Sequence, residues 1–262
     1  MKQIIRSLTV AVVGLTLMSQ GLAQQRDDKP KSKEAALQQQ IDELKAGQQQ
    51  ILKELQEIKK ILQSFQDAAN QPPQEVVLPV GGEPFKGSAA ARVAIIEYSD
   101  FQCPFCGQYA REIYPHLDSD YVKSGKVRYY FRDLPLPSHP QALTAALAAR
   151  CAGEQGKFWE MHDSLFANQE ALAPADLSRR AQGFGLDEAK FNACLANGKY
   201  RENIRRSTAG AERMGINGTP AFFLGVVDPN GNTVRSSKLI LGAEGYDAFK
   251  SALDELLAAP KQ

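Results

Sequence analysis

Apolar residues recur with a helical period in the N-terminal part of this chain. Between residues 34 and 66 they follow one another at alternating steps of four and three, which is a heptad pattern of about four repeats. The seam positions are Leu37, Ile41, Leu44, Gln48, Ile51, Leu55, Ile58, Leu62 and Phe65. The pattern predicts a coiled-coil oligomerisation helix within residues 24–70, and the alternative is one amphipathic helix packed against its own domain.

Charged and additional apolar positions beside this seam favour self-association. Glu54 and Lys59 occupy positions that pair between parallel chains, and Leu52 and Ile61 widen the apolar stripe. Leucine at the first core position with isoleucine at the second disfavours a two-stranded coil. We therefore predict a homo-oligomer, either a trimer or a dimer, in which the polar Gln48 fixes the alignment of the helices.

The remaining hydrophobic pattern alternates between strand-like and helix-like stretches. Strands are predicted at residues 92–99, 126–132, 221–227 and near 237–241, with helices at 106–117 and 246–257 and a long helical region at 139–214. Residues 71–83 carry two proline clusters and two adjacent glycines, which predicts a linker. The expected fold class is α/β, with a sheet interrupted by a helical subdomain within a domain spanning residues 84–262.

The first 23 residues have the pattern of a secretory signal. A positive segment with Lys2 and Arg6 precedes an uncharged stretch at residues 8–18, and small residues end at a predicted cleavage after Ala23. No later segment approaches the length of a membrane span, so we expect a periplasmic or otherwise exported protein that is soluble after cleavage; an uncleaved signal would instead tether it. The net charge of +1 gives no electrostatic reason to expect nucleic acid as a partner.

Two of the four cysteines, Cys103 and Cys106, are separated by only two residues and lie between a predicted strand and a predicted helix. A thiol at a helix N-terminus has a lowered pKa, so Cys103 is predicted to attack and Cys106 to resolve. A zinc site is a weaker interpretation because no second such pair exists, and a static disulfide would close too short a loop to stabilise the fold. We therefore predict thiol–disulfide exchange, with no metal and no cofactor.

The other two cysteines, Cys151 and Cys194, lie far apart in separate helix-like segments. Export to an oxidising compartment favours a structural disulfide between them. Two buried free thiols are the alternative, because a sequence carries no geometry.

Three features in order give the chain a family resemblance over residues 84–258. They are Cys103-Pro104-Phe105-Cys106 after a strand, the helical insert, and Gly218-Thr219-Pro220 before a later strand. This arrangement resembles the DsbA-like branch of the thioredoxin superfamily, whose members are exported thiol–disulfide oxidoreductases.

The resemblance implies roles for individual residues. Pro220 is expected to be cis and to lie against the cysteine pair, and Thr219 is expected to contact sulfur and substrate backbone. Glu97 matches a buried acid beneath the active site, which could exchange a proton with Cys106, although a solvent-facing glutamate is the alternative.

The sequence also departs from DsbA itself. Phe105 offers no polar group to a thiolate, so we predict a less acidic Cys103 and a less oxidising couple than in DsbA. Thr219 resembles the isomerases DsbC and DsbG, and the N-terminal stalk resembles ScsC-type proteins. The predicted function is therefore an oligomeric oxidoreductase and isomerase of exported cysteine-containing proteins. The alternatives are a dedicated oxidase reoxidised by a membrane redox partner and a non-catalytic coiled-coil scaffold or chaperone.

Overall fold

The computed structural model describes residues 33–63 and 75–260, which belong to two compact units, Met1–Pro72 and Pro73–Gln262. The predicted signal at residues 1–23 and the seam residue Phe65 lie outside the described residues. Within the described ranges, no helix combines the length and the apolar character that crossing a membrane requires.

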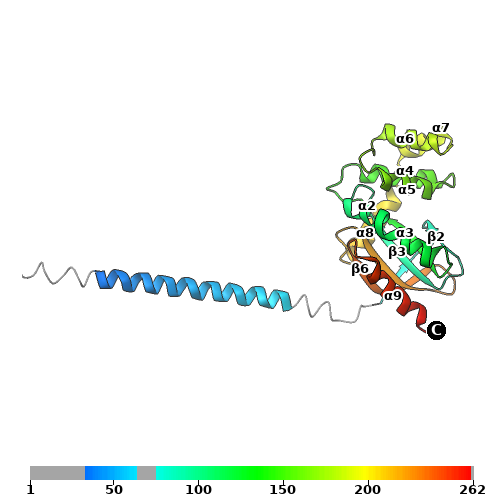
Figure 1. Cartoon of the computed structure of the whole chain (residues 1–262). Helices are drawn as coiled ribbons and strands as arrows, with labels where there is room; N and C mark the ends of the chain where they lie inside the picture. The colour runs from blue at the N-terminus through cyan, green and yellow to red at the C-terminus, as the bar shows by residue number, and fades with distance from the viewer. Residues whose placement is uncertain (1–32, 64–74, 261–262) are drawn as a thin grey trace, which may run out of the picture. The chain divides into compact units, whose positions relative to one another are not determined.

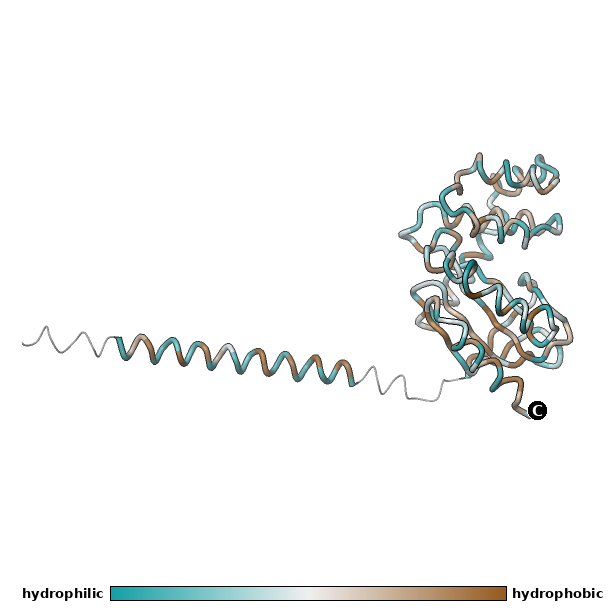
Figure 2. Tube along the Cα trace, in the orientation of Figure 1, coloured by the Kyte–Doolittle hydropathy of each residue, from teal (hydrophilic) through white to brown (hydrophobic). Residues whose placement is uncertain are grey.

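The first unit contributes one long helix, at residues 33–63. Its predicted seam residues in this range are exposed, and Figure 2 shows apolar segments recurring along the helix between hydrophilic ones. Side chains four residues apart bond along its surface, for example Gln38 to Asp42 at 3.1 Å and Gln50 to Glu54 at 3.0 Å. Such pairs stabilise a helix by only about 0.2–0.5 kcal/mol each. Packing of the exposed apolar stripe against another surface would stabilise this helix more.

The second unit is built on one mixed six-stranded sheet in the order β1-β6-β5-β3-β4-β2. The strands are β1 (Val76–Pro79), β2 (Phe85–Lys86), β3 (Val93–Ser99), β4 (Val127–Asp133), β5 (Ala221–Val227) and β6 (Thr233–Leu241). Strands β3 and β4 are parallel, and every other neighbouring pair is antiparallel. The central strand β3 is buried along its whole length, which accounts for its nearly continuous apolar sequence.

The predicted linker at residues 71–83 is wrong from Val76 onward. Val76–Pro79 forms β1 and pairs with β6, while the side chains of Leu78 and Val80 are buried in the core. Pro79 is tolerated because β1 lies at the edge of the sheet, where a missing N–H costs no ladder bond. Alternating apolar residues therefore outweigh the proline and glycine signals in this stretch.

Helices cover both faces of the sheet and extend beyond one end of it (Figure 1). The helix predicted at residues 106–117 is a continuous run of α2 (Pro104–Gln108), a π-helical turn (Tyr109–Ile113), α3 (Tyr114–Leu117) and a second π-helical turn (Asp118–Val122). The predicted helical region at 139–214 contains α4 (Ala142–Gly153), α5 (Phe158–Ala167), α6 (Pro174–Gly183), α7 (Glu188–Asn197) and α8 (Arg201–Arg213). The last helix is α9 (Tyr246–Ala258).

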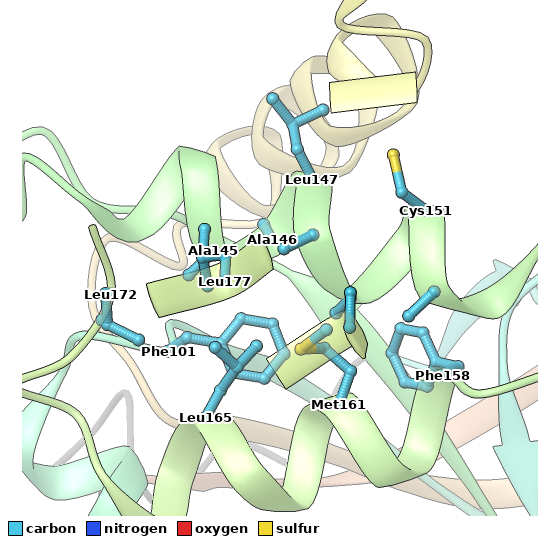
Figure 3. Close-up of a cluster of buried hydrophobic side chains, with 14 of the residues drawn as sticks. Phe101, Ala145, Ala146, Leu147, Cys151, Phe158, Met161, Leu165, Leu172 and Leu177 are labelled. Atoms are coloured by element: carbon cyan, nitrogen blue, oxygen red, sulfur yellow. The ribbon is translucent and has the colours of Figure 1, made fainter. Parts of the chain in front are cut away.

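The helical subdomain has its own apolar core. Figure 3 shows Leu165 and Met161 of α5 facing Ala145 and Ala146 of α4. Phe101 joins this cluster from the turn after β3, and Cys103 at the start of α2 and Cys106 within α2 belong to it as well. The core of the subdomain is thus continuous with the cysteine pair.

The cysteines Cys151 of α4 and Cys194 of α7 are joined in the structure, with their sulfur atoms 1.97 Å apart. The bond spans 43 residues and connects two helices of the subdomain that packs against the cysteine pair.

Candidate active site

The cysteine pair lies where β3 gives way to α2. Asp100 shapes the turn, because its Oδ1 accepts a bond from the Gln102 N–H at 2.7 Å and its Oδ2 accepts one from the Leu136 N–H at 2.8 Å. Cys103 then occupies the N-cap of α2, and Pro104 begins the helix, where its missing N–H is not needed. The local sequence therefore places the first thiol at the positive end of a helix.

The two sulfurs have different surroundings. Cys103 is 3% exposed and Cys106 is 0% exposed, whereas Phe105 between them is 63% exposed. The Sγ of Cys103 lies 3.4 Å from the carbonyl oxygen of Thr219, and the Thr219–Pro220 peptide bond is cis. The structure thus brings together the four residues of the predicted active-site loop, at positions 103–106, and their predicted partners Thr219 and Pro220.

These surroundings shift the pKa values of the two thiols in opposite directions. A hydrogen bond from the Cys106 thiol lowers the pKa of Cys103 to about 5, helped by the Thr219 side chain and backbone N–H groups of the helix and opposed by burial. Burial raises the pKa of Cys106 well above its ordinary value, and the neighbouring Cys103 raises it further. Cys103 can therefore carry the thiolate at neutral pH while Cys106 keeps its proton.

We expect the reduced protein to gain its first thiolate near pH 5. Ultraviolet thiolate absorbance, followed from pH 3 to pH 9, should show one transition close to that value. The Cys106→Ala variant should shift the transition upward because it removes the largest stabilising contact of the thiolate. A wild-type transition at the ordinary thiol value of about 8.5 would contradict this assignment.

Glu97 lies in β3, two residues before Ser99 on the same face of the strand, and is 1% exposed. Burial raises its pKa to about 7, although a hydrogen bond from the Tyr129 hydroxyl opposes the rise. The Ser99 side chain also opposes the raised pKa of both Glu97 and Cys106. The glutamate is therefore buried rather than solvent-facing, and it can hold or release a proton near neutral pH.

The raised pKa of Glu97 predicts a pH-dependent stability. Because its folded pKa of about 7 exceeds the ordinary value of 4.5, its contribution is complete below pH 4.5 and is lost as the pH rises through 7. The difference is up to about 3 kcal/mol. Denaturant unfolding of the oxidised protein, in which the cysteine pair does not titrate, should show this loss, and Glu97→Gln should remove it. Parallel pH profiles for both proteins would refute it.

Several residues at this site carry no motif that predicts their roles. Ser99 is the last residue of β3 and Asp100 follows it, and His139 Nδ1 lies 2.7 Å from Asp100 Oδ2. An aspartate at the end of a strand is a common turn residue, so the local sequence could have predicted the role of Asp100 in the turn. Nothing in the local sequence predicts its contact with His139, which lies 39 residues later.

The fold and the dithiol define the class of this protein, a thioredoxin-like thiol–disulfide oxidoreductase. A family model described as thioredoxin matches residues 80–238, and the chain belongs to this family. A variant of alpha-DsbA1 from Wolbachia pipientis is 25% identical, covering 69% of this chain and 93% of that one with a TM-score of 0.60. A thioredoxin-like oxidoreductase from Silicibacter pomeroyi is also 25% identical, covering 69% and 95% with a TM-score of 0.58.

These structures place the chain in the DsbA-like branch, which confirms the predicted family and α/β fold class. Oxidised BdbD from Bacillus subtilis has the same fold at 21% identity, with a TM-score of 0.62 over 72% of this chain and all of that one. The Na(+)/H(+) antiporter NhaA 3 of Salinispora tropica is 44% identical over 140 residues, which are 53% of this chain and 21% of that protein. The matched part is thus about a fifth of the antiporter's length.

Proposed function

We propose that this protein is an exported, oligomeric oxidoreductase that isomerises disulfides of cysteine-containing proteins through Cys103 and Cys106. The observation that carries thiol–disulfide exchange through this pair is the lowered pKa of Cys103 and the raised pKa of Cys106 beside the cis Thr219–Pro220 bond. One sulfur is ready to attack, and the other is held protonated until it is needed.

In the proposed reaction, the Cys103 thiolate attacks one sulfur of a substrate disulfide. A bond forms between Cys103 Sγ and that sulfur, the substrate bond breaks, and the other substrate sulfur leaves as a thiolate. Attack on the mixed disulfide by a different substrate thiolate then releases Cys103 unchanged. The substrate has exchanged one disulfide for another without net oxidation.

Cys106 resolves the mixed disulfide when no substrate thiol attacks it. Its thiol must first lose a proton, and Glu97 is the proposed acceptor because its pKa of about 7 suits transfer in either direction. The resulting thiolate attacks Cys103, the substrate leaves reduced, and the pair becomes a disulfide. Thr219 and Pro220 are proposed to bind the substrate backbone. The exposed aromatic ring of Phe105 is proposed to contact the side chains around the substrate cysteine.

The N-terminal helix supports the oligomeric part of the proposal. Its exposed apolar stripe follows the heptad positions from Leu37 to Leu62, and we propose that the same helix of other copies covers it. Several active sites on one assembly would raise the local concentration of thiolates around a misfolded substrate. The proposed export rests on the signal pattern of residues 1–23.

A dedicated oxidase is the second candidate, and the acidity of Cys103 favours it. A thiol with a pKa of about 5 is a good leaving group, so a disulfide that contains it tends to pass to substrates. An oxidase would need a membrane redox partner to restore that disulfide.

The redox state in living cells separates these two functions. Acid quenching followed by alkylation should trap Cys103 and Cys106 mainly as thiols in an isomerase. A pair found mainly as a disulfide would reject the isomerase in favour of the oxidase.

A further inference from the structure

The side chain of Gln169, between α5 and α6, reaches the active-site turn from the helical subdomain. Its Nε2 donates to the carbonyl of Phe101 at 3.0 Å and to the carbonyl of Cys103 at 2.8 Å. Its Oε1 accepts from Arg111 Nη1 at 3.4 Å, and the same nitrogen donates to the carbonyl of Phe166 at 3.0 Å. The Gln169 amide therefore bonds to both ends of the Phe101–Cys103 turn, and Arg111 in turn bonds to the amide oxygen.

Gly107 leaves the space that this amide occupies. A Cβ at position 107 would lie 1.9 Å from Gln169 Oε1 and 2.6 Å from its Cδ. The backbone of Gly107 has no positive φ that would require glycine, and glycine inside a helix costs up to about 1 kcal/mol relative to alanine. Close approach by Gln169 accounts for glycine here.

The bonds made by Gln169 act on the residue that attacks. Cys103 is the N-cap of α2, and its carbonyl already accepts the N–H of Gly107 at 3.1 Å. Fixing this carbonyl together with that of Phe101 fixes the backbone on both sides of Gln102. The position of Cys103 Sγ over the first turn of α2, and beside the Thr219 carbonyl, depends on that backbone.

We propose that Gln169 is a positioning residue for thiol–disulfide exchange, which ties the helical subdomain to the two backbone carbonyls that bracket the active-site turn and so holds Cys103 Sγ at the helix N-terminus. The proposal rests on the proposed function, since it concerns how the attacking sulfur is placed. It predicts that loss of this amide makes Cys103 a poorer thiolate even where the protein remains folded.

The test compares Gln169→Leu with Gln182→Leu in the full-length reduced protein. Leucine keeps much of the volume but cannot donate, and Gln182 is an exposed glutamine of the same subdomain. The probe is dipyridyl disulfide at pH 4, below the pKa of Cys103, where the rate follows the thiolate fraction. We expect Gln169→Leu to react about threefold more slowly, because a rise of one pKa unit lowers the thiolate fraction about tenfold while the more basic thiolate is the better nucleophile. Gln182→Leu should react like the wild type.

A folded Gln169→Leu protein that reacts at the wild-type rate would overturn the proposal. The small-molecule probe reports on Cys103 without any protein substrate, so this result is separate from a failure of the proposed isomerase function. Circular dichroism and the unfolding midpoint establish that each variant is folded.

A double-mutant cycle keeps the test decisive if Gln169→Leu does not fold. Gly107→Ala alone should slow the probe reaction, because its methyl group displaces the Gln169 amide. In a Gln169→Ala background the same change should have little effect, since the remaining contact at 2.7 Å is with the flexible end of Arg111. Additive effects of the two changes would contradict the proposal.

Discussion

Cys103→Ser is expected to lower the rate of disulfide exchange with a scrambled protein substrate by at least about a thousandfold. The thiolate is the nucleophile, and the pKa of about 5 makes Cys103 a thiolate at neutral pH. A serine hydroxyl in the same position remains protonated and cannot attack sulfur. Recovery of activity from a scrambled, disulfide-bonded substrate measures the loss directly.

Two matched variants show that the effect belongs to Cys103. Cys106→Ser should still attack substrates, but mixed disulfides should accumulate wherever no substrate thiol attacks them, because the resolving thiol is absent. The paired change Cys151→Ser and Cys194→Ser should leave exchange intact, since that bond joins α4 to α7. Full activity in Cys103→Ser would reject both the isomerase and the oxidase function.

Ile51→Asp combined with Ile58→Asp is expected to convert the protein into monomers and to lower its isomerase rate at least about tenfold. Both side chains lie on the exposed apolar stripe of the N-terminal helix, and a carboxylate there would have to be buried between copies. Oxidation of a small dithiol should change little, because one active site suffices for it. Light scattering measures the mass, and scrambled substrate measures the isomerisation.

The control uses the opposite side of the same helix. Lys53→Asp combined with Lys60→Asp alters charge at the outermost heptad positions, and we expect the oligomer to persist. An unchanged mass in the two-isoleucine variant would reject the coiled-coil proposal. Monomers that retain full isomerase activity would separate oligomerisation from function.

The strands of the sheet were predicted well where their sequences are continuously apolar. Residues 221–227 match β5, and 92–99 differ from β3 by one residue. The first half of β6 was missed because Arg235 and Ser236 interrupt the apolar pattern of a strand near the sheet edge. In β1 the proline and glycine signals hid a pairing with β6, which depends on residues about 160 positions later.

The chemistry of the site was more predictable than the parts that support it. Cys103, Cys106 and Pro220 carry short motifs in a fixed order, and Glu97 has a family position within a buried strand. Gln169 has no such motif, because its role arises only when the helical subdomain folds back over the turn after β3. Long-range hydrogen bonds of this kind leave no local pattern in a sequence.

Trapping of mixed disulfides tests the central claim, that Cys103 is the sulfur that exchanges with protein substrates. A Cys106→Ala protein produced in cells, quenched with acid and alkylated, should carry other proteins through reductant-sensitive bonds. Peptide mapping should locate those bonds at Cys103. Bonds found at Cys151 or Cys194, or the same yield of adducts from a Cys103→Ala and Cys106→Ala double variant, would contradict the account.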